Sequence, residues 1–176
     1  VEAVSAEEAV AAGADMVLIS LTLNTGSEAR DAANVEVFCR LAGEARRLGL
    51  PVVGEYYPSR ADDLTKEEMH EQVYRACRML AELGADLIKT FYTHKFKAVT
   101  EACPVPILGL GAEKMPKQVQ ALSLAERILR NGGRGVVFGR NALQVPDPAA
   151  FQRALCEVVK RAMPAAQAAK QYGLKD

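Results

Sequence analysis

A lysine ends a short apolar segment in the stretch AELGADLIKTFYT, residues 81–93. Residues 85–88 have the length and polarity of a buried strand, and Lys89 follows them directly. Because side chains alternate along a strand, Leu87 and Lys89 share one face and Ile88 points to the other. An amine that is withdrawn from water loses its proton more easily and can attack a carbonyl group. The alternative is a solvated strand-end lysine, or one that pairs with a neighbouring acid.

Two further side chains that could react lie at the end of another strand-like segment, GEYYPS. Glu55 and Tyr57 are two residues apart, so on a strand they lie on the same face. A carboxylate and a phenol that converge at the end of a strand are suited to proton transfer. Two alternatives stay open: Tyr57 packs against Pro58, or Glu55 forms a buried ion pair with Lys89 or Arg140.

Glycines follow the last two strand-like segments, in GLGAEK and FGRN. Gly109, Gly111 and Gly139 would let backbone N–H groups approach an anion closely. Arg140 adds a guanidinium whose forked donors match a phosphate group. Singly, such glycines are ordinary turn residues between a strand and a helix. Two such turns in succession, with an arginine, predict a phosphate-binding site.

The elements that must position these groups alternate regularly along the chain. Thr65 and Glu68 have the spacing of a capping box at a helix start. Apolar runs on both strand faces, alternating with amphipathic helices, predict an α/β fold with a parallel, helix-covered sheet. The expected strands are 16–23, 51–57, 85–90, 105–111 and 134–140, and the main expected helices are 33–49, 64–84, 117–133 and 147–163.

The five strands fit part of a closed barrel better than an open sheet. A (β/α)8 barrel typically needs about 250 residues, and this chain has 176. An open doubly wound sheet would favour a GxGxxG loop after its first strand, whereas the glycines here follow the last two strands, where barrels bind phosphate. We therefore expect residues 1–163 to be the last five units of an eight-unit (β/α)8 TIM barrel, without the first three units. Residues 164–176 are expected to form a peripheral tail, and Val1 in place of Met indicates a processed or truncated start.

Composition narrows the class of protein. The chain is 49% hydrophobic and 25% charged, enough to bury a core, and its 22 basic and 22 acidic side chains balance. This balance argues against a nucleic acid or an anionic membrane as partner. No apolar run approaches the roughly 18 residues of a membrane span. With two histidines and no CxxC pair, we expect no metal or other cofactor and read the cysteines as buried free thiols of a cytoplasmic protein, at positions Cys39, Cys77, Cys103 and Cys156.

The motifs GADLIKTFYT, CPVPILGLG and GVVFGRNALQ, in this order and spacing, resemble a family of class I Schiff-base aldolases. That family (DeoC/FbaB/LacD-like) includes the archaeal-type fructose-bisphosphate aldolase, the autoinducer-2 phosphate thiolase and an aminodideoxyheptulosonate synthase. The likeness extends over most of residues 5–160. It implies a barrel, a homo-oligomer, and a lyase or transferase acting on a small phosphorylated carbonyl compound.

The resemblance also implies roles for individual residues. Lys89, the lysine of IKT, would form the imine with the substrate, and Tyr57, which precedes a proline, would donate and accept protons. Gly111, Gly139 and Arg140 fall on the family's phosphate-binding positions. The chain has Leu110-Gly111 where the family often has Gly-Gly, and Glu55 where bisphosphate aldolases commonly have tryptophan.

Three hypotheses follow from these residues. The first is a Schiff-base lyase or transferase of phosphorylated carbonyl compounds. The second is a phosphate-binding barrel isomerase or decarboxylase that uses Glu55 without imine chemistry. The third is a non-catalytic barrel fragment with exposed sheet edges, which would assemble with copies of itself.

Overall fold

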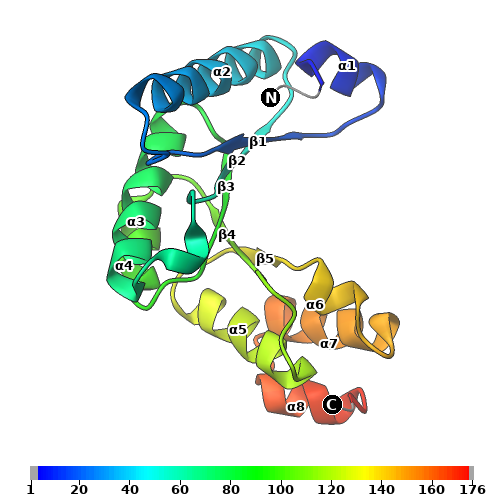
Figure 1. The fold of residues 1–176 in the computed structure, drawn as a ribbon. Helices are drawn as coiled ribbons and strands as arrows, with labels where there is room; N and C mark the ends of the chain where they lie inside the picture. The colour runs from blue at the N-terminus through cyan, green and yellow to red at the C-terminus, as the bar shows by residue number, and fades with distance from the viewer. Residues whose placement is uncertain (1–3, 175–176) are drawn as a thin grey trace. The chain divides into compact units, whose positions relative to one another are not determined.

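The computed structural model describes residues 4–174, which form two compact units divided between Ile107 and Leu108. The first unit contains β1 (Val17–Leu21), β2 (Val52–Tyr56) and β3 (Leu87–Thr90), and consecutive strands pair in parallel (Figure 1). In the second unit, β4 (Ile107–Leu110), which starts at the boundary, pairs in parallel with β5 (Gly135–Val137). The expected α/β class with parallel strands is confirmed.

The first unit covers one face of its strands with helices. Its helices are α1 (Ala6–Ala11), α2 (Glu28–Arg47), the 3₁₀ turn η1 (Ala61–Asp63), α3 (Lys66–Glu82) and α4 (Phe96–Ala102). The side chains of Leu21, Tyr56 and Ile88 are buried on the covered face, where α2 packs on β1 and α3 on β2 and β3. A Cβ on Gly54 would lie 2.9 Å from the Ala85 Cβ. A larger residue at this position would therefore push the strand away from its packing partners.

The second unit has its own apolar core. Its helices are α5 (Gln118–Arg130), α6 (Arg140–Leu143), α7 (Pro148–Arg161) and α8 (Ala165–Gln171). Leu122, Phe151 and Val158 are buried in a cluster with Ala165 and Ala168 of α8. The stretch expected to be a peripheral tail thus contributes a helix to this core, because its small alanines allow α8 close contact with α5 and α7.

Several element boundaries differ from the expected ones. Helix α2 begins at Glu28 and not at residue 33, because Ser27 caps it by accepting a hydrogen bond from the Arg30 N–H. The preceding loop is held by Asp31, whose carboxylate accepts from the Thr25 hydroxyl at 2.6 Å and from two backbone N–H groups. The capping box of Thr65 and Glu68 is confirmed at the start of α3.

The strands are shorter than expected. Residues 138–140, expected to continue the last strand, instead turn into α6.

All four cysteines are free, but the expected burial holds only for Cys77 and Cys103. Cys39 and Cys156 are exposed. Burial raises the pKa of the Cys77 thiol to about 12, so this thiol stays protonated. Within residues 4–174, no helix combines the length and apolarity needed to cross a membrane.

Candidate active site

The expected reactive side chains of the first unit lie on the strand face that the helices leave uncovered. Strand pairing sets Ser20 of β1 beside Glu55 of β2, and Glu55 beside Lys89 of β3. On the opposite face the neighbouring residues are buried, as the alternation in β3 shows: Ile88 and Thr90 are buried, whereas Leu87 and Lys89 are partly exposed. The three polar side chains therefore form one row across three adjacent strands.

Glu55 connects the other two members of this row. Its Oε1 lies 2.6 Å from the Lys89 Nζ, and its Oε2 accepts a hydrogen bond from the Ser20 hydroxyl at 2.9 Å. The Lys89 and Glu55 side chains are 21% and 14% exposed, so this ion pair is shielded yet reachable from solvent. Of the alternatives for Glu55, the pair with Lys89 is present. A carboxylate this close to an amine can take its proton and return it without any large movement.

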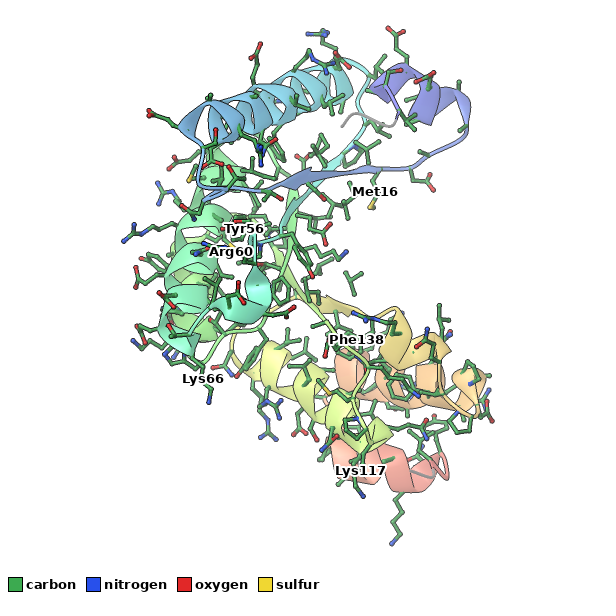
Figure 2. The ribbon with its side chains drawn as sticks, in the orientation of Figure 1. Met16, Tyr56, Arg60, Lys66, Lys117 and Phe138 are labelled. Carbon is green, nitrogen blue, oxygen red and sulfur yellow. The ribbon has the colours of Figure 1, made fainter. Side chains whose placement is uncertain are left out.

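Tyr57 lies just past the end of β2, on the same side as Glu55. The intervening Tyr56 is buried instead, and its phenol donates to the Gln72 Oε1 of α3 at 2.8 Å; Figure 2 shows it between β2 and α3. Tyr57 is 51% exposed, and its ring packs edge-on against Phe91, two residues after Lys89, at 5.2 Å between centroids. The loop after β3 therefore holds the tyrosine ring near the strand end that carries the lysine.

The same loop contacts the start of α3 through two histidines. The His70 Nδ1 lies 3.1 Å from the Thr93 hydroxyl, and the His70 and His94 rings are 5.3 Å apart. The His94 Nε2 in turn lies 3.0 Å from the Glu67 carboxylate. Burial lowers the pKa of His70, and the charges of His94 and Lys95 lower it further. His70 is thus a neutral packing residue that anchors the loop after Lys89.

In the second unit, Gly109 and Gly111 have packing roles at the end of β4. A Cβ on Gly109 would collide with the Ile128 side chain of α5, and one on Gly111 would lie 2.8 Å from the Phe138 ring, which Figure 2 labels. The Gly111 N–H is hydrogen-bonded to the Val137 carbonyl oxygen at 3.2 Å. The phosphate roles expected for both glycines stay predictions.

Gly139 and Arg140 mark the start of α6 and leave more room. A Cβ on Gly139 would meet nothing within 4 Å. The exposed Arg140 guanidinium donates a hydrogen bond to the Ala112 carbonyl oxygen at 3.0 Å, and a guanidinium has five N–H donors in all. This bond fixes the arginine beside the loop after β4 and leaves donors that can reach an anion.

Two polar residues of these sites were not among those predicted. Ser20 was not predicted because it is 35 residues away from Glu55 in the sequence, and only strand register brings the two side chains together. Asn141 is buried, and its amide nitrogen donates to the carbonyl oxygens of Gly111 and Glu113 at 2.9 and 2.8 Å. Its Oδ1 accepts from the Met115 N–H at 2.7 Å. The sequence signal for Asn141 was its position as the last residue of the GRN motif.

Comparison with known proteins gives a family model and several relatives. The model described as DeoC/LacD family aldolase matches residues 1–145. The chain is 30% identical over 158 residues to a 2-amino-4,5-dihydroxy-6-oxo-7-(phosphonooxy)heptanoate synthase of Streptomyces griseus, covering 88% of this chain and 56% of the synthase. The chain thus spans about half the length of this relative.

Solved structures of aldolases are also similar. A Schiff-base-forming fructose-1,6-bisphosphate aldolase matches with a TM-score of 0.82 and 32% identity, over 90% of this chain and 64% of the other. An archaeal fructose-1,6-bisphosphate aldolase, with its catalytic lysine covalently bound to a carbinolamine intermediate, matches with a TM-score of 0.79 and 32% identity, over 88% of this chain and 62% of the other. The expected fold, part of a (β/α)8 barrel, agrees with this partial coverage.

Proposed function

The chain belongs to the DeoC/LacD family of aldolases, and from this premise we propose that it forms a Schiff base through Lys89 in an aldolase or aldolase-like transferase reaction. The observation that carries the proposal is the 2.6 Å contact between the Lys89 Nζ and the Glu55 Oε1 at the carboxyl ends of parallel strands. This is the end of the strands at which barrel enzymes assemble their active sites. The covalently bound lysine of the archaeal aldolase supports the assignment.

Imine formation moves two protons from the Lys89 ammonium group to the departing oxygen. In the proposed sequence, the Glu55 carboxylate takes a proton from the Lys89 ammonium group, and the neutral amine attacks the substrate carbonyl carbon. The attack gives a zwitterion whose nitrogen passes a proton to the oxygen, which yields the carbinolamine. The protonated Glu55 then gives its proton to the carbinolamine hydroxyl, which leaves as water. The product is an iminium cation beside a regenerated carboxylate, so the charges before and after the step are the same.

The iminium cation then draws electrons from the adjacent carbon–carbon bond, which breaks to give an enamine. A hydroxyl proton must leave the departing fragment in this step, and a proton must return to the enamine carbon. We assign these transfers to Tyr57, assisted by Glu55, because both side chains lie on the uncovered face and the Tyr57 ring is held against Phe91. Hydrolysis of the remaining imine frees Lys89.

The substrate class in this proposal is a small phosphorylated carbonyl compound. Arg140 and the glycines of the second unit, Gly109, Gly111 and Gly139, are the proposed phosphate-binding residues. Binding energy from a phosphate remote from the reacting carbons is a general means of positioning them. A homo-oligomer located in the cytoplasm completes the proposal, in keeping with the resemblance to the Schiff-base aldolases.

Borohydride trapping tests the imine directly. The full chain, as its gene encodes it, is incubated with a panel of phosphorylated ketoses, reduced and digested, and the modified peptide is identified by mass spectrometry. We expect an adduct on the peptide that contains Lys89, absent in Lys89→Met and present in Lys97→Met. Lys97 is the matched control because it also forms an ion pair, with Glu101 on α4.

The second hypothesis, an isomerase or decarboxylase that uses Glu55 alone, makes the opposite prediction. In that case Lys89 serves only as the charge partner of Glu55, turnover is measurable and no adduct is trapped. A folded wild-type protein that turns over substrate without any lysine adduct would therefore overturn the Schiff-base proposal.

A further inference from the structure

Glu55 has a hydrogen-bond partner on the side away from Lys89, namely Ser20. The two residues are register partners in β1 and β2, and the Ser20 hydroxyl donates to the Glu55 Oε2 at 2.9 Å. The other carboxylate oxygen, Oε1, is the one that meets the lysine. The two oxygens of one carboxylate are thus divided between a hydroxyl and an amine from the strands on either side.

The Glu55 carboxylate needs a second contact to fix its orientation, because the last side-chain torsion angle of glutamate is only weakly restricted. The χ3 angle of glutamate has broad wells, so the carboxylate plane is poorly fixed by the side chain itself. A single contact through Oε1 would leave the plane free to rotate about that contact. A second contact, made to the other oxygen by a short side chain on a paired strand, fixes the plane and keeps Oε1 directed at the Lys89 amine.

We propose that Ser20 is a positioning residue, which orients the Glu55 carboxylate and thereby sets how readily the Lys89 amine reacts. This inference rests on the proposed Schiff-base function for its catalytic significance, but its geometric content concerns only the three side chains of the row. Ser20 does not touch the reacting atoms in this scheme, since its hydroxyl lies on the far side of the carboxylate from Lys89.

The surroundings of Ser20 favour this role over a purely structural one. Ser20 is exposed, and it borders a cavity of about 700 Å³ that runs along β1 between α1 and α2. Its strand neighbours Ile19 and Leu21 point to the opposite, buried face. Replacement of the hydroxyl should therefore leave the core intact and act on Glu55 alone.

The test measures Lys89 reactivity with a water-soluble N-hydroxysuccinimide ester of acetic acid. Acetylation of the Lys89 peptide is quantified by mass spectrometry relative to that of Lys97, an internal standard on the same unit. In the resting protein the contact with Glu55 holds the Lys89 side chain and keeps it from the reagent. Loss of the Ser20 hydrogen bond weakens this contact, so the ratio should rise by about threefold to tenfold in Ser20→Ala. Ser20→Thr keeps the hydroxyl on a residue well suited to a strand, and the ratio should return to within about twofold of the wild-type value.

Glu55→Gln supplies the second half of a double-mutant cycle. If Ser20 acts through Glu55, Ser20→Ala should add nothing to the ratio once Glu55 is glutamine. Ser123→Ala is the matched control, since it removes another hydroxyl that is hydrogen-bonded, to the Val119 carbonyl oxygen on α5. Ser20→Cys, nearly isosteric but a weak donor, should give an intermediate ratio and replaces Ser20→Ala if that variant does not fold.

The outcomes for the inference and for the proposed function are separate. An unchanged ratio in Ser20→Ala, or an equal rise in the Glu55→Gln background, would overturn the positioning role whatever the trapping experiment gives. Where the wild type traps a ketose, the adduct should form about fivefold more slowly in Ser20→Ala at saturating substrate, because imine formation, unlike acetylation, needs a correctly directed Glu55 to transfer protons. Half-saturation should be unchanged and the rate restored in Ser20→Thr. An unchanged trapping rate would limit Ser20 to the resting ion pair and overturn its part in the reaction. If the wild type traps nothing, the Schiff-base proposal fails, and the labelling ratio still decides whether Ser20 orients Glu55.

Discussion

Lys89 in the first unit and Asn141 in the second are both held by short polar contacts, but of different kinds. Lys89 pairs with a charged side chain at 2.6 Å on a partly exposed face. Asn141 is buried and neutral, and all three of its hydrogen bonds at 2.7–2.9 Å go to backbone groups of the loop after β4.

The difference follows from what each region must hold in place. Strand register alone brings Ser20, Glu55 and Lys89 together, because the ladder already satisfies the backbone. The loop after β4 has no ladder, and buried backbone groups need partners from elsewhere. A side chain with both donors and an acceptor supplies them, and asparagine has both. The proposed reactive residues of this chain are therefore held by regular structure, whereas the candidate anion loop depends on one amide.

Removal of that amide should have the largest effect on stability. Asn141→Ala leaves the carbonyl oxygens of Gly111 and Glu113 and the Met115 N–H without their partner, so we expect a loss of about 2–4 kcal/mol in the free energy of unfolding, measured by urea denaturation. Asn131→Ala, at a half-buried asparagine whose amide donates to the Arg127 carbonyl oxygen, should cost about 1 kcal/mol or less. An equally small loss in the two variants would show that the loop after β4 does not depend on the Asn141 amide.

The glycines of the second unit give the next largest effect and separate packing from anion binding. A Cβ on Gly109 would lie against the Ile128 Cδ1 and 2.7 Å from its Cγ1, so Gly109→Ala should destabilise the protein by about 1–3 kcal/mol through overpacking. Gly139 has φ −95° and open space around it, so Gly139→Ala should leave thermal unfolding nearly unchanged.

The activities of these two variants complete the test. If Gly139 approaches a phosphate, Gly139→Ala should need a higher ketose concentration for half-maximal borohydride trapping although it is as stable as the wild type. A Gly139→Ala protein with unchanged trapping would assign this glycine to turn geometry alone.

The sequence carried enough information to place the proposed reactive side chains on their strands, but not to find the side chains that hold them in position. The alternation of apolar and polar residues placed Leu87 and Lys89 on one strand face, and the same rule separated Glu55 and Tyr57 from the buried Tyr56. These are local properties of period two. Ser20 depends on the register of β1 against β2, which is a property of pairing between strands and not of either segment.

Boundaries were predicted less well where side chains bind the local backbone. Asp31 and Ser27 organise the residues read as a loop into a capped helix start, five residues earlier than periodicity indicated. At the other end of the chain, Ala165 and Ala168 are three residues apart and share a helix face, which was a usable signal for α8. This signal was missed because alanine is small and common on exposed faces too. It indicates a buried helix face only when the partner helices are known.

Mild acid should produce the smallest effect, confined to the first unit, because the only histidines in the sequence are His70 and His94. Burial, with the charges of His94 and Lys95, lowers the pKa of His70 from its ordinary 6.5. As the pH falls below about 6.5, the unfolded chain takes up this proton before the folded one does, so stability decreases until the pH passes the folded pKa. One proton limits the slope to about 1.4 kcal/mol per pH unit.

Hydrogen exchange, corrected for its intrinsic pH dependence, should therefore show that α3 loses protection between pH 7 and about 5.5 while α5 does not. The variant His70→Gln should abolish this difference between the two helices. Equal loss in both helices would mean that carboxylates present in each unit, and not His70, control the response to acid.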